Sequence, residues 1–343
     1  MVAKVKLTRL ALNCAERLFE TASERERFLQ ALATPPSLPP ALLWRQDPPS
    51  LPPFPLLPPL PWQPPWVTRV PVGTRSGQHP LHAAGAYYCL DSSSVFAAVP
   101  LLNVPAAPAL IIDVCAAPGG KSLLAWRALQ PRYLLCNETI PKRLGMLISN
   151  LKRCRVHPVG VTCCDSAALA AAFPTSADGV IVDAPCSGQS LLVKGQKADG
   201  CFHPLTLRHN QRRQKRILAT SSTLVRPGGW LLYSTCTFSR EENEAVAEWF
   251  SVKYPHFVPQ VVPQLAAYQS HLSSLPCYRL WPQSQEGAGA FTILWSHQGE
   301  GEPHPLPPLD PWLRWQSRPD GVADPFAAKP DNPEESADDQ SKG

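Results

Sequence analysis

Hydrophobic residues follow two rhythms along this chain. From Lys6 to Leu32 they recur at helical spacing, which predicts one or two short amphipathic helices. From about Leu110 onward, short apolar runs alternate with helical patterns, which predicts an α/β fold with a mostly parallel sheet and helices on both faces. The predicted strands are Leu110 to Val114, Tyr133 to Cys136, Val159 to Cys163, Gly179 to Val182 and Trp230 to Tyr233, followed by Phe257 to Val262 and Phe291 to Trp295.

Prolines set the stretch between these two regions apart. Sixteen of the chain's 41 prolines fall between Thr34 and Pro80. Because proline lacks a backbone N–H, we expect no regular helix and no central strand there. The sequence predicts a polyproline-like connector that packs on the body through Trp44, Trp62 and Trp66.

The last part of the chain is acidic and poor in apolar residues. Residues 300–343 carry ten acidic and four basic side chains, so we expect this tail to be largely disordered. The predicted organisation is a small N-terminal helical segment (1–33), the proline-rich connector (34–80), one α/β domain (81–298) and the tail (299–343).

The chain without this tail is basic. The net charge is +5 for all 343 residues and about +11 when residues 300–343 are left out. Such a charge favours a polyanionic partner, because neutralising phosphates releases counterions. No apolar run approaches the ~20 residues that span a bilayer, and the 11 cysteines form no repeated metal-binding spacing. We therefore expect a cytoplasmic protein with reduced cysteines, no membrane contact and no metal.

A loop of small residues follows the first predicted strand and leads into a helical pattern. It reads Cys115-Ala116-Ala117-Pro118-Gly119-Gly120-Lys121. Glycines let a ligand approach the backbone, and a helix N-terminus offers unpaired N–H groups. A nucleotide-binding P-loop would need glycine where Cys115 stands, and the dinucleotide pattern G-x-G-x-x-G is absent.

Carboxylates follow the next three strands, at Glu138, Asp165 and Asp183. The carboxyl ends of strands in an open α/β sheet border the ligand crevice. One such acid could be a helix cap, but three in corresponding places favour a ligand site. The loop and the acids together fit an adenosine-containing ligand without a polyphosphate.

Two cysteines differ from the other nine, because Cys186 and Cys236 both follow strands that end at this crevice. A lone cysteine in an apolar strand is usually a core residue, but a pair beside Asp183 suits a particular chemistry. Carbon 5 of cytosine cannot attack a sulfonium methyl unaided, so a thiolate must first add to carbon 6. A second acid–base group must then help to remove the carbon 5 proton and break the enzyme–base bond.

These residues resemble the NOL/NOP/Sun family of RNA cytosine-5 methyltransferases, and are most similar to its bacterial small-subunit rRNA branch, RsmB/RsmF. The resemblance covers roughly residues 80–296 and implies a class I Rossmann-like S-adenosylmethionine methyltransferase fold with a seven-stranded sheet. The chain departs from the family pattern at Gly188-Gln189-Ser190, where members usually have Gly-Glu-Gly. The motifs that carry the likeness are Asp113 to Lys121, Asn137-Glu138, Asp183 to Gly188 and Arg226 to Thr237.

The resemblance also implies a role for each site residue. Cys236 would be the nucleophile, Cys186 would assist product release, and Asp183 would contact the target base and the cofactor. The other residues implied to hold S-adenosylmethionine are Cys115, Ala116, Ala117, Pro118, Gly119, Gly120, Lys121, Glu138 and Asp165. The implied product is 5-methylcytosine in rRNA, and similarity to the 16S branch favours 16S rRNA as the substrate, with tRNA as the alternative. We expect the protein to be a monomer.

A basic stretch lies between the two cysteine motifs. We expect part of it, represented by Lys194, Lys197, Arg212 and Arg213, to contact RNA phosphates. The alternative for these residues is a solvated helix face.

Three other functions remain open from the sequence. A DNA cytosine-5 methyltransferase would need only a Pro-Cys loop, and a ribosome-assembly factor of the same fold could bind RNA without catalysis. A redox or metal protein would need a feature such as a C-x-x-C pair, which this sequence lacks.

Overall fold

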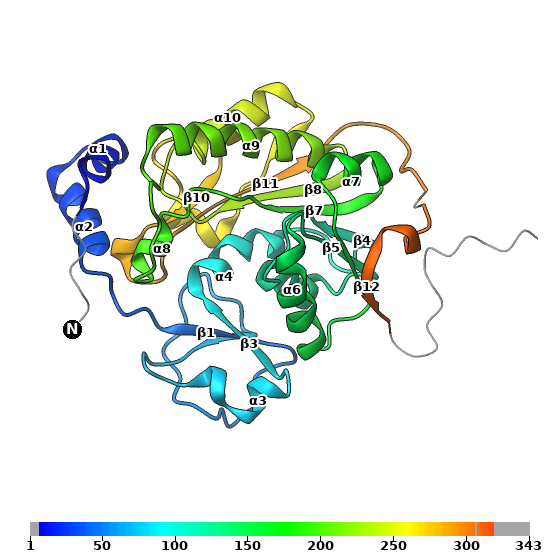
Figure 1. Ribbon diagram of the computed structural model, residues 1–343, viewed down its shortest axis with the longest axis horizontal. Coiled ribbons are helices and arrows are strands. Elements are labelled where there is room, and N and C mark those ends of the chain that lie inside the picture. The colour runs from blue at the N-terminus through cyan, green and yellow to red at the C-terminus, as the bar shows by residue number, and fades with distance from the viewer. Residues whose placement is uncertain (1–6, 306, 319–343) are drawn as a thin grey trace, which may run out of the picture.

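A nine-stranded sheet forms the centre of the computed structural model, which describes residues 7–305 and 307–318 (Figure 1). The strands run in the order β10, β11, β8, β7, β4, β5, β6, β12, and β9 pairs with β11. The five neighbours from β8 to β6 are parallel, whereas β9, β10, β11 and β12 pair antiparallel. The bounds are β4 Leu110–Asp113, β5 Tyr133–Asn137, β6 Val159–Thr162, β7 Ala177–Asp183, β8 Val225–Thr235, β9 Phe257–Pro259, β10 Cys277–Leu280, β11 Ala290–His297 and β12 Leu313–Ser317.

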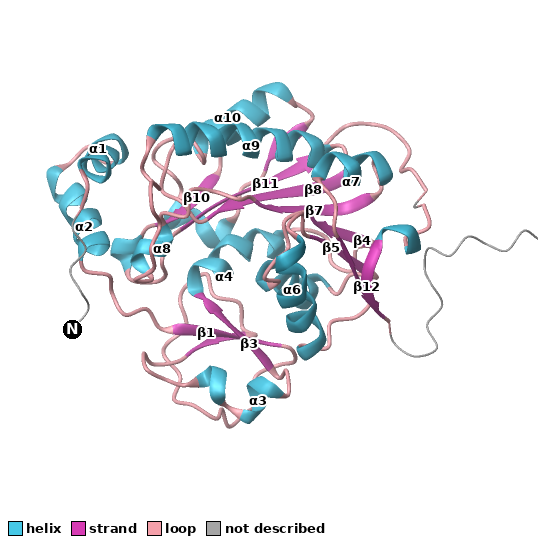
Figure 2. Cartoon of the chain, viewed as in Figure 1, coloured by secondary structure: helices cyan, strands magenta, loops and turns pink. Residues whose placement is uncertain are grey.

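Helices cover both faces of this sheet, as the sequence predicts. In Figure 2, α7, α9 and α10 lie over one face, and α4 and α6 lie over the other. The helices of this part of the chain are α4 (Ser92–Ala98), α5 (Gly120–Leu129), α6 (Pro141–Arg153), α7 (Ser166–Ala172), α8 (Ser190–Val193), α9 (Pro204–Ser222) and α10 (Glu244–Lys253). The mostly parallel α/β fold is therefore confirmed, and all seven strands predicted from the hydrophobic pattern are present. The sheet has nine strands and not the seven that the resemblance implied, because β10 and β12 add antiparallel strands at its two ends.

The sheet separates the two largest apolar clusters of the described residues. Successive side chains of a strand point to opposite faces. Accordingly, Ile111 of β4 packs with Phe96 of α4 and Leu124 of α5, whereas Ile112 packs on the other side with Leu218 of α9. Because both faces are covered, β4 is buried along its whole length, which explains its continuous apolar run.

Two helices precede the sheet, as predicted: α1 (Arg9–Leu18) and α2 (Ala22–Ala33). Each begins after a threonine whose hydroxyl accepts a hydrogen bond from the first turn, Thr8 for α1 and Thr21 for α2. The buried face of α2 brings Phe28 edge-on against Phe238, with ring centroids 5.2 Å apart. The N-terminal helices thus pack directly behind the loop that follows β8.

The proline-rich segment contains a central strand, so the expectation of none was wrong. β1 (Pro40–Trp44) lies between β2 (Val67–Arg69) and β3 (Tyr87–Asp91) in an antiparallel three-stranded sheet. Only the first residue of β1 is proline, so the next four N–H groups remain available for pairing. The sheet adjoins η1 (Ser76–Gln78) and α3 (Pro80–Ala83), and further 3-10 turns are η2 (Val99–Asn103), η3 (Pro263–Tyr268) and η4 (Pro282–Ser284).

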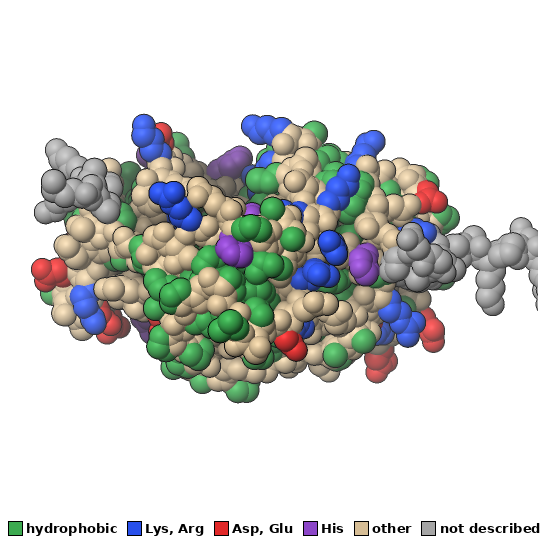
Figure 3. Space-filling view, turned by 90° about the horizontal axis from the view of Figure 1, so that it is seen from below, with side chains coloured by type: hydrophobic (Ala, Val, Ile, Leu, Met, Phe, Trp, Pro, Cys, Tyr) green, Lys and Arg blue, Asp and Glu red, His purple; other side chains and the backbone are tan. Residues whose placement is uncertain are grey.

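Tryptophans anchor this segment, as expected. Trp44 and Trp62 are buried, and Trp66 packs partly buried against the main core. The stretch between β1 and β2 nevertheless reaches the surface, where Leu51 is 87% exposed. Figure 3 shows hydrophobic side chains gathered on the face seen from below.

A short part of the C-terminal tail, which the sequence predicts to be largely disordered, is folded. η5 (Asp310–Trp312) leads into β12, which pairs antiparallel with β6 at one edge of the sheet. The short apolar sequence around Trp312 and Leu313 packs against the core. The acidic composition of the tail as a whole obscured this short apolar sequence as evidence for a folded segment. The rest of the predicted disordered tail, 319–343, lies outside the described residues. Among the helices in the described ranges, none has the length and apolar character to cross a bilayer.

Candidate active site

A buried acid at the end of β4 fixes both ends of the loop between β4 and α5. Asp113, the last residue of β4, accepts hydrogen bonds from the Ser122 hydroxyl (2.6 Å) and the Cys115 N–H (3.3 Å). Burial raises the pKa of Asp113 to about 7. Gly119 stands before α5 with φ at +109°, a conformation that side chains other than glycine rarely adopt. The residues predicted to bind the cofactor through their backbone therefore form a tightly fixed turn.

Glu138 lies directly beyond β5, next to this turn. Its buried carboxylate accepts from the Ile140 N–H (2.9 Å) and forms an ion pair with Arg143 (2.9 Å). Arg143 also donates to the carbonyl of Ala117. The arginine therefore connects the acid after β5 to the loop after β4.

Asp165 lies beyond β6 and caps a helix. One of its carboxylate oxygens accepts from the N–H groups of Ala167 (2.9 Å) and Ala168 (2.8 Å) at the start of α7. This is the alternative that the sequence left open for one acid, and the residue is exposed. The structure thus gives Asp165 a local role that does not depend on any ligand.

Asp183, the last residue of β7, connects three of the predicted site segments. It accepts from the Lys121 ammonium (2.7 Å) and from the Ser234 hydroxyl (3.0 Å). Lys121 belongs to the loop after β4, and Ser234 lies near the end of β8, two residues before Cys236. The ion pair therefore places a positive and a negative charge beside the thiol at 236.

The two singled-out cysteines meet, as their positions after neighbouring strands predict. The Sγ atoms of Cys186 and Cys236 are 3.3 Å apart, and both residues are free thiols. Cys236 is exposed and Cys186 is half-buried. A reacting group arriving from solvent can therefore reach the sulfur of Cys236.

The two thiols differ in acidity. The hydrogen bond from Cys186 lowers the pKa of Cys236 to about 7, although the surrounding protein atoms, which displace part of the thiol's hydration, and the charge of Asp183 oppose this. The Lys121 ammonium also lowers it. The pKa of Cys186 is raised well above its ordinary value by the same hydrogen bond and by burial. The pair thus favours a thiolate at 236 and a proton on Cys186.

The predicted RNA-contacting residues lie on two elements. Lys194 and Lys197 are exposed just after α8, Arg212 is exposed on α9, and Arg213 is half-buried there. Burial raises the pKa of Cys115, and the positive charge of Arg213 opposes that rise. None of the four forms an ion pair with any residue in 7–305 or 307–318.

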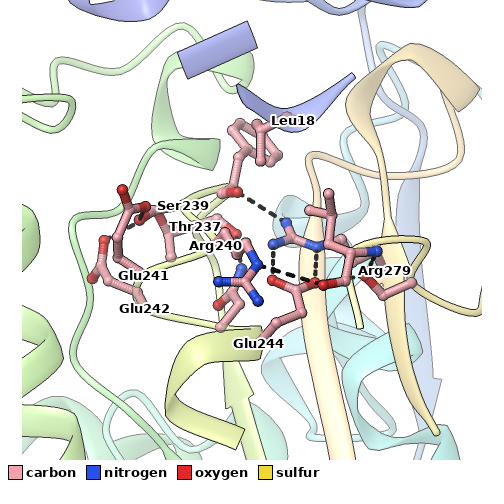
Figure 4. Close-up of polar contacts among 12 residues, drawn as sticks. Leu18, Thr237, Ser239, Arg240, Glu241, Glu242, Glu244 and Arg279 are labelled. Atoms are coloured by element: carbon pink, nitrogen blue, oxygen red, sulfur yellow. Dashed lines mark hydrogen bonds and ion pairs between the residues drawn. The ribbon is translucent and has the colours of Figure 1, made fainter. Parts of the chain in front are cut away.

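Sequence reasoning missed the roles of the acidic run that follows Cys236. Glu244 forms two 2.5 Å hydrogen bonds to the buried guanidinium of Arg279, as Figure 4 shows. Asn243 accepts from the Thr235 hydroxyl and donates to the Thr237 carbonyl (2.9 Å). The sequence offered one signal for these roles: the acidic run lies among apolar residues. Charged side chains in such a segment are usually paired with other side chains inside the protein.

Comparison with known proteins supports the resemblance. The family described as 16S rRNA methyltransferase RsmB/F matches residues 101–294. Ribosomal RNA small subunit methyltransferase F of Cronobacter sakazakii is 31% identical over 230 residues, which are 66% of this chain and 48% of that protein. The protein of the same name from Escherichia coli is 35% identical over 178 residues, 52% of this chain and 37% of that protein. The chain thus spans about half or less of the length of these relatives.

Solved structures agree on the fold. A methyltransferase homologue from Pyrococcus horikoshii superposes with a TM-score of 0.64 at 22% identity, covering 84% of this chain and 99% of that one. NSun6 from the same organism gives a TM-score of 0.58 at 23% identity, covering 65% of this chain and 56% of that one. The family match covers more than half of the chain and includes both cysteine loops and the loop after β4. The chain belongs to the RsmB/F family of 16S rRNA methyltransferases.

Proposed function

We propose that this protein is an S-adenosylmethionine-dependent RNA methyltransferase that forms 5-methylcytosine in 16S rRNA. The observation that carries the proposal is the contact of 3.3 Å between an exposed thiol of lowered pKa and a second thiol of raised pKa. The chemistry at carbon 5 of cytosine needs one sulfur to add to the ring and a second group to handle a proton.

The residues around the β4–α5 loop fit S-adenosylmethionine. Gly119 and Gly120 carry no side chain of their own at the start of α5, where helix N-terminal N–H groups can bind an amino-acid carboxylate. Glu138 and Asp165 lie beyond adjacent strands, where carboxylates accept from ribose hydroxyls or an adenine amine. When bound, the cofactor supplies an electrophilic methyl group. We assign its binding to residues 115–121, Glu138, Asp165 and Asp183.

Cys236 is the nucleophile in this proposal. Its thiolate adds to carbon 6 of the cytosine, and the ring electrons displaced toward carbon 5 make that carbon able to take a methyl group. Asp183, held by Lys121 and Ser234, lies beside the thiol and is placed to accept a hydrogen bond from the base. Because its oxygens are already oriented, little rearrangement is required when the base arrives.

Cys186 serves the second half of the reaction. After methyl transfer, carbon 5 carries a proton that must leave before the bond between Cys236 and carbon 6 can break. Loss of that proton to solvent water returns the electrons of the C–H bond to the ring, and the sulfur of Cys236 departs as a thiolate that accepts a hydrogen bond from the Cys186 thiol. The thiol of Cys186, in contact with that sulfur, assists the departure.

The choice of RNA rests on the relatives, which are named as ribosomal RNA small subunit methyltransferases. We propose that the exposed Lys194, Lys197 and Arg212, together with Arg213, contact phosphates near the site. A tRNA substrate remains the alternative. We also propose that the protein acts in the cytoplasm as a monomer.

Substitution of the nucleophile tests the function. Purified Cys236→Ala protein should transfer no methyl group from labelled S-adenosylmethionine to 16S rRNA, while it still binds the cofactor. Cys163→Ala, which changes a half-buried thiol after β6, is the matched control and should keep wild-type activity. Methylation by Cys236→Ala at the wild-type rate would refute the assignment, and transfer to tRNA but not to 16S rRNA would refute the substrate.

A further inference from the structure

The residues that follow the two cysteines are bonded to each other. Ser187 comes directly after Cys186, and Thr237 comes directly after Cys236. Their hydroxyl oxygens are 2.7 Å apart. The two cysteine loops, which belong to different strands, are therefore joined one residue beyond the thiols.

One carboxylate, that of Glu242, binds both of these residues. It accepts from the Ser187 N–H (2.9 Å) and hydroxyl (2.5 Å), and from the Thr237 hydroxyl at 3.5 Å. It also accepts from the Gln214 amide on α9 (3.0 Å), which donates in turn to the carbonyl of Pro185 (3.1 Å). Glu242 thus fixes the residues on both sides of Cys186 and the residue after Cys236.

This carboxylate differs from the acids beside it in the chain. Glu241 pairs with Arg17 and Glu244 pairs with Arg279, whereas Glu242 forms no ion pair within residues 7–305 and 307–318. Figure 4 shows Glu241 and Glu242 on the side away from Arg279. Glu242 is fully buried, and burial raises its pKa. A buried carboxylate without a cation costs folding free energy, so fold stability alone does not account for it.

We propose that Glu242 is a positioning residue that holds the Cys186 and Cys236 loops together, and so maintains the contact between their thiols. Its negative charge also helps to keep the proton on Cys186. The consequence for turnover rests on the proposed function, but the consequence for the thiol separation does not.

Disulfide cross-linking measures this separation directly. Diamide takes two electrons and two protons from a thiol pair, so Cys186 and Cys236 become a disulfide whose rate of formation depends on their proximity. At about pH 9, ionisation of Cys236 no longer limits the reaction. Peptide mass analysis then gives the rate for wild type, Glu242→Gln and the control Glu241→Gln.

We expect Glu242→Gln to cross-link roughly tenfold more slowly than wild type, because it loses charge-assisted hydrogen bonds to Ser187. Glu241→Gln removes an adjacent acid of the same type and should cross-link at the wild-type rate. Cofactor binding and the melting temperature establish that each variant is folded. A folded Glu242→Gln protein that cross-links as fast as wild type would overturn the proposal.

Ser187→Ala provides a second variant if Glu242→Gln does not fold. It removes the hydroxyl that bonds both Glu242 and Thr237 but buries no new charge, and it should also slow the cross-link. An unchanged rate of cross-linking in Ser187→Ala would count equally against the proposed role of Glu242. On 16S rRNA, Glu242→Gln should lower kcat without changing KM. If wild type itself is inactive on RNA, the proposed function fails while the cross-linking result still decides the role of Glu242.

Discussion

At the scale of single residues, the thiol contact makes a prediction about pH. The pKa of Cys236 is lowered to about 7 by the hydrogen bond from Cys186, so the thiolate forms as the pH rises through that value. Alkylation of Cys236 by iodoacetamide should increase with pH around this midpoint. Cys186→Ala removes the hydrogen-bond donor and should move the midpoint upward, toward the ordinary value of 9.0. An unchanged midpoint in that variant would contradict the assigned cause.

The same cysteine has a second test in the reaction itself. Cys186→Ala should still form the bond between Cys236 and the cytosine but release it slowly, because the group that assists departure is gone. A covalent RNA–protein adduct should then appear on denaturing gels. The double variant Cys186→Ala/Cys236→Ala serves as the control and should show none. If the single variant releases methylated RNA as fast as wild type, the release role is wrong.

Which residues meet at the site was predictable from sequence to a considerable extent. The rule that parallel strands expose their carboxyl ends at one edge placed Cys186, Cys236 and Asp183 together, and the structure agrees. The rule could not show that the Asp165 carboxylate also caps α7. It also could not assign Glu242, because its partners come from three separate segments and only packing brings them together.

At the scale of elements, a buried ion pair connects β10 to the start of α10. The guanidinium of Arg279 is 1% exposed and the carboxylate of Glu244 is 0% exposed. Arg279→Met should lower the free energy of unfolding by about 3–5 kcal/mol, because it leaves Glu244 buried without a partner. Arg240→Met breaks a solvent-exposed pair with Glu248 and should change it by less than about 1 kcal/mol. Urea denaturation measures both.

A double variant at this ion pair distinguishes the cost of an unpaired buried charge from the cost of lost packing. Adding Glu244→Gln to Arg279→Met removes the unpaired charge and should recover part of the lost stability. A double variant less stable than the Arg279→Met single variant would show that the hydrogen bonds of Glu244 to other groups, such as Ser270, matter more than its charge.

Strands that contain an apolar run were predictable from the sequence, whereas short strands without such a run were not. β4, β5 and β6 are buried along their whole lengths, and β7 and β8 contain buried apolar runs at residues 180–182 and 230–233. β1 and β12 are short and lie in proline-rich or acidic surroundings, so composition gave the opposite indication. Their strand state comes from hydrogen bonds to β3 and β6, which are distant in sequence.

At the scale of the whole molecule, the N-terminal helices, the α/β sheet and the proline-rich segment share apolar cores. The proline-rich segment supplies Trp62 to the main cluster, and α2 supplies Phe28 to the cluster behind the Cys236 loop. The division into 1–33, 34–80, 81–298 and 299–343 therefore remains a prediction about sequence character. The segments differ in composition, but their apolar side chains pack together in shared cores.

The strand at the end of the described chain has a consequence for the solution behaviour of the protein. β12 occupies the outer side of β6, so the N–H and C=O groups of β6 (Val159–Thr162) that point to this side face a partner strand. A chain cut after residue 309 would leave that side open as a template for a neighbouring molecule. Light scattering should then show concentration-dependent self-association, whereas a chain cut after residue 318 should behave like the full-length protein. Absence of self-association in the shorter chain would mean that β6 tolerates an open edge. Self-association of the shorter chain alone would assign the protection of this sheet edge to β12.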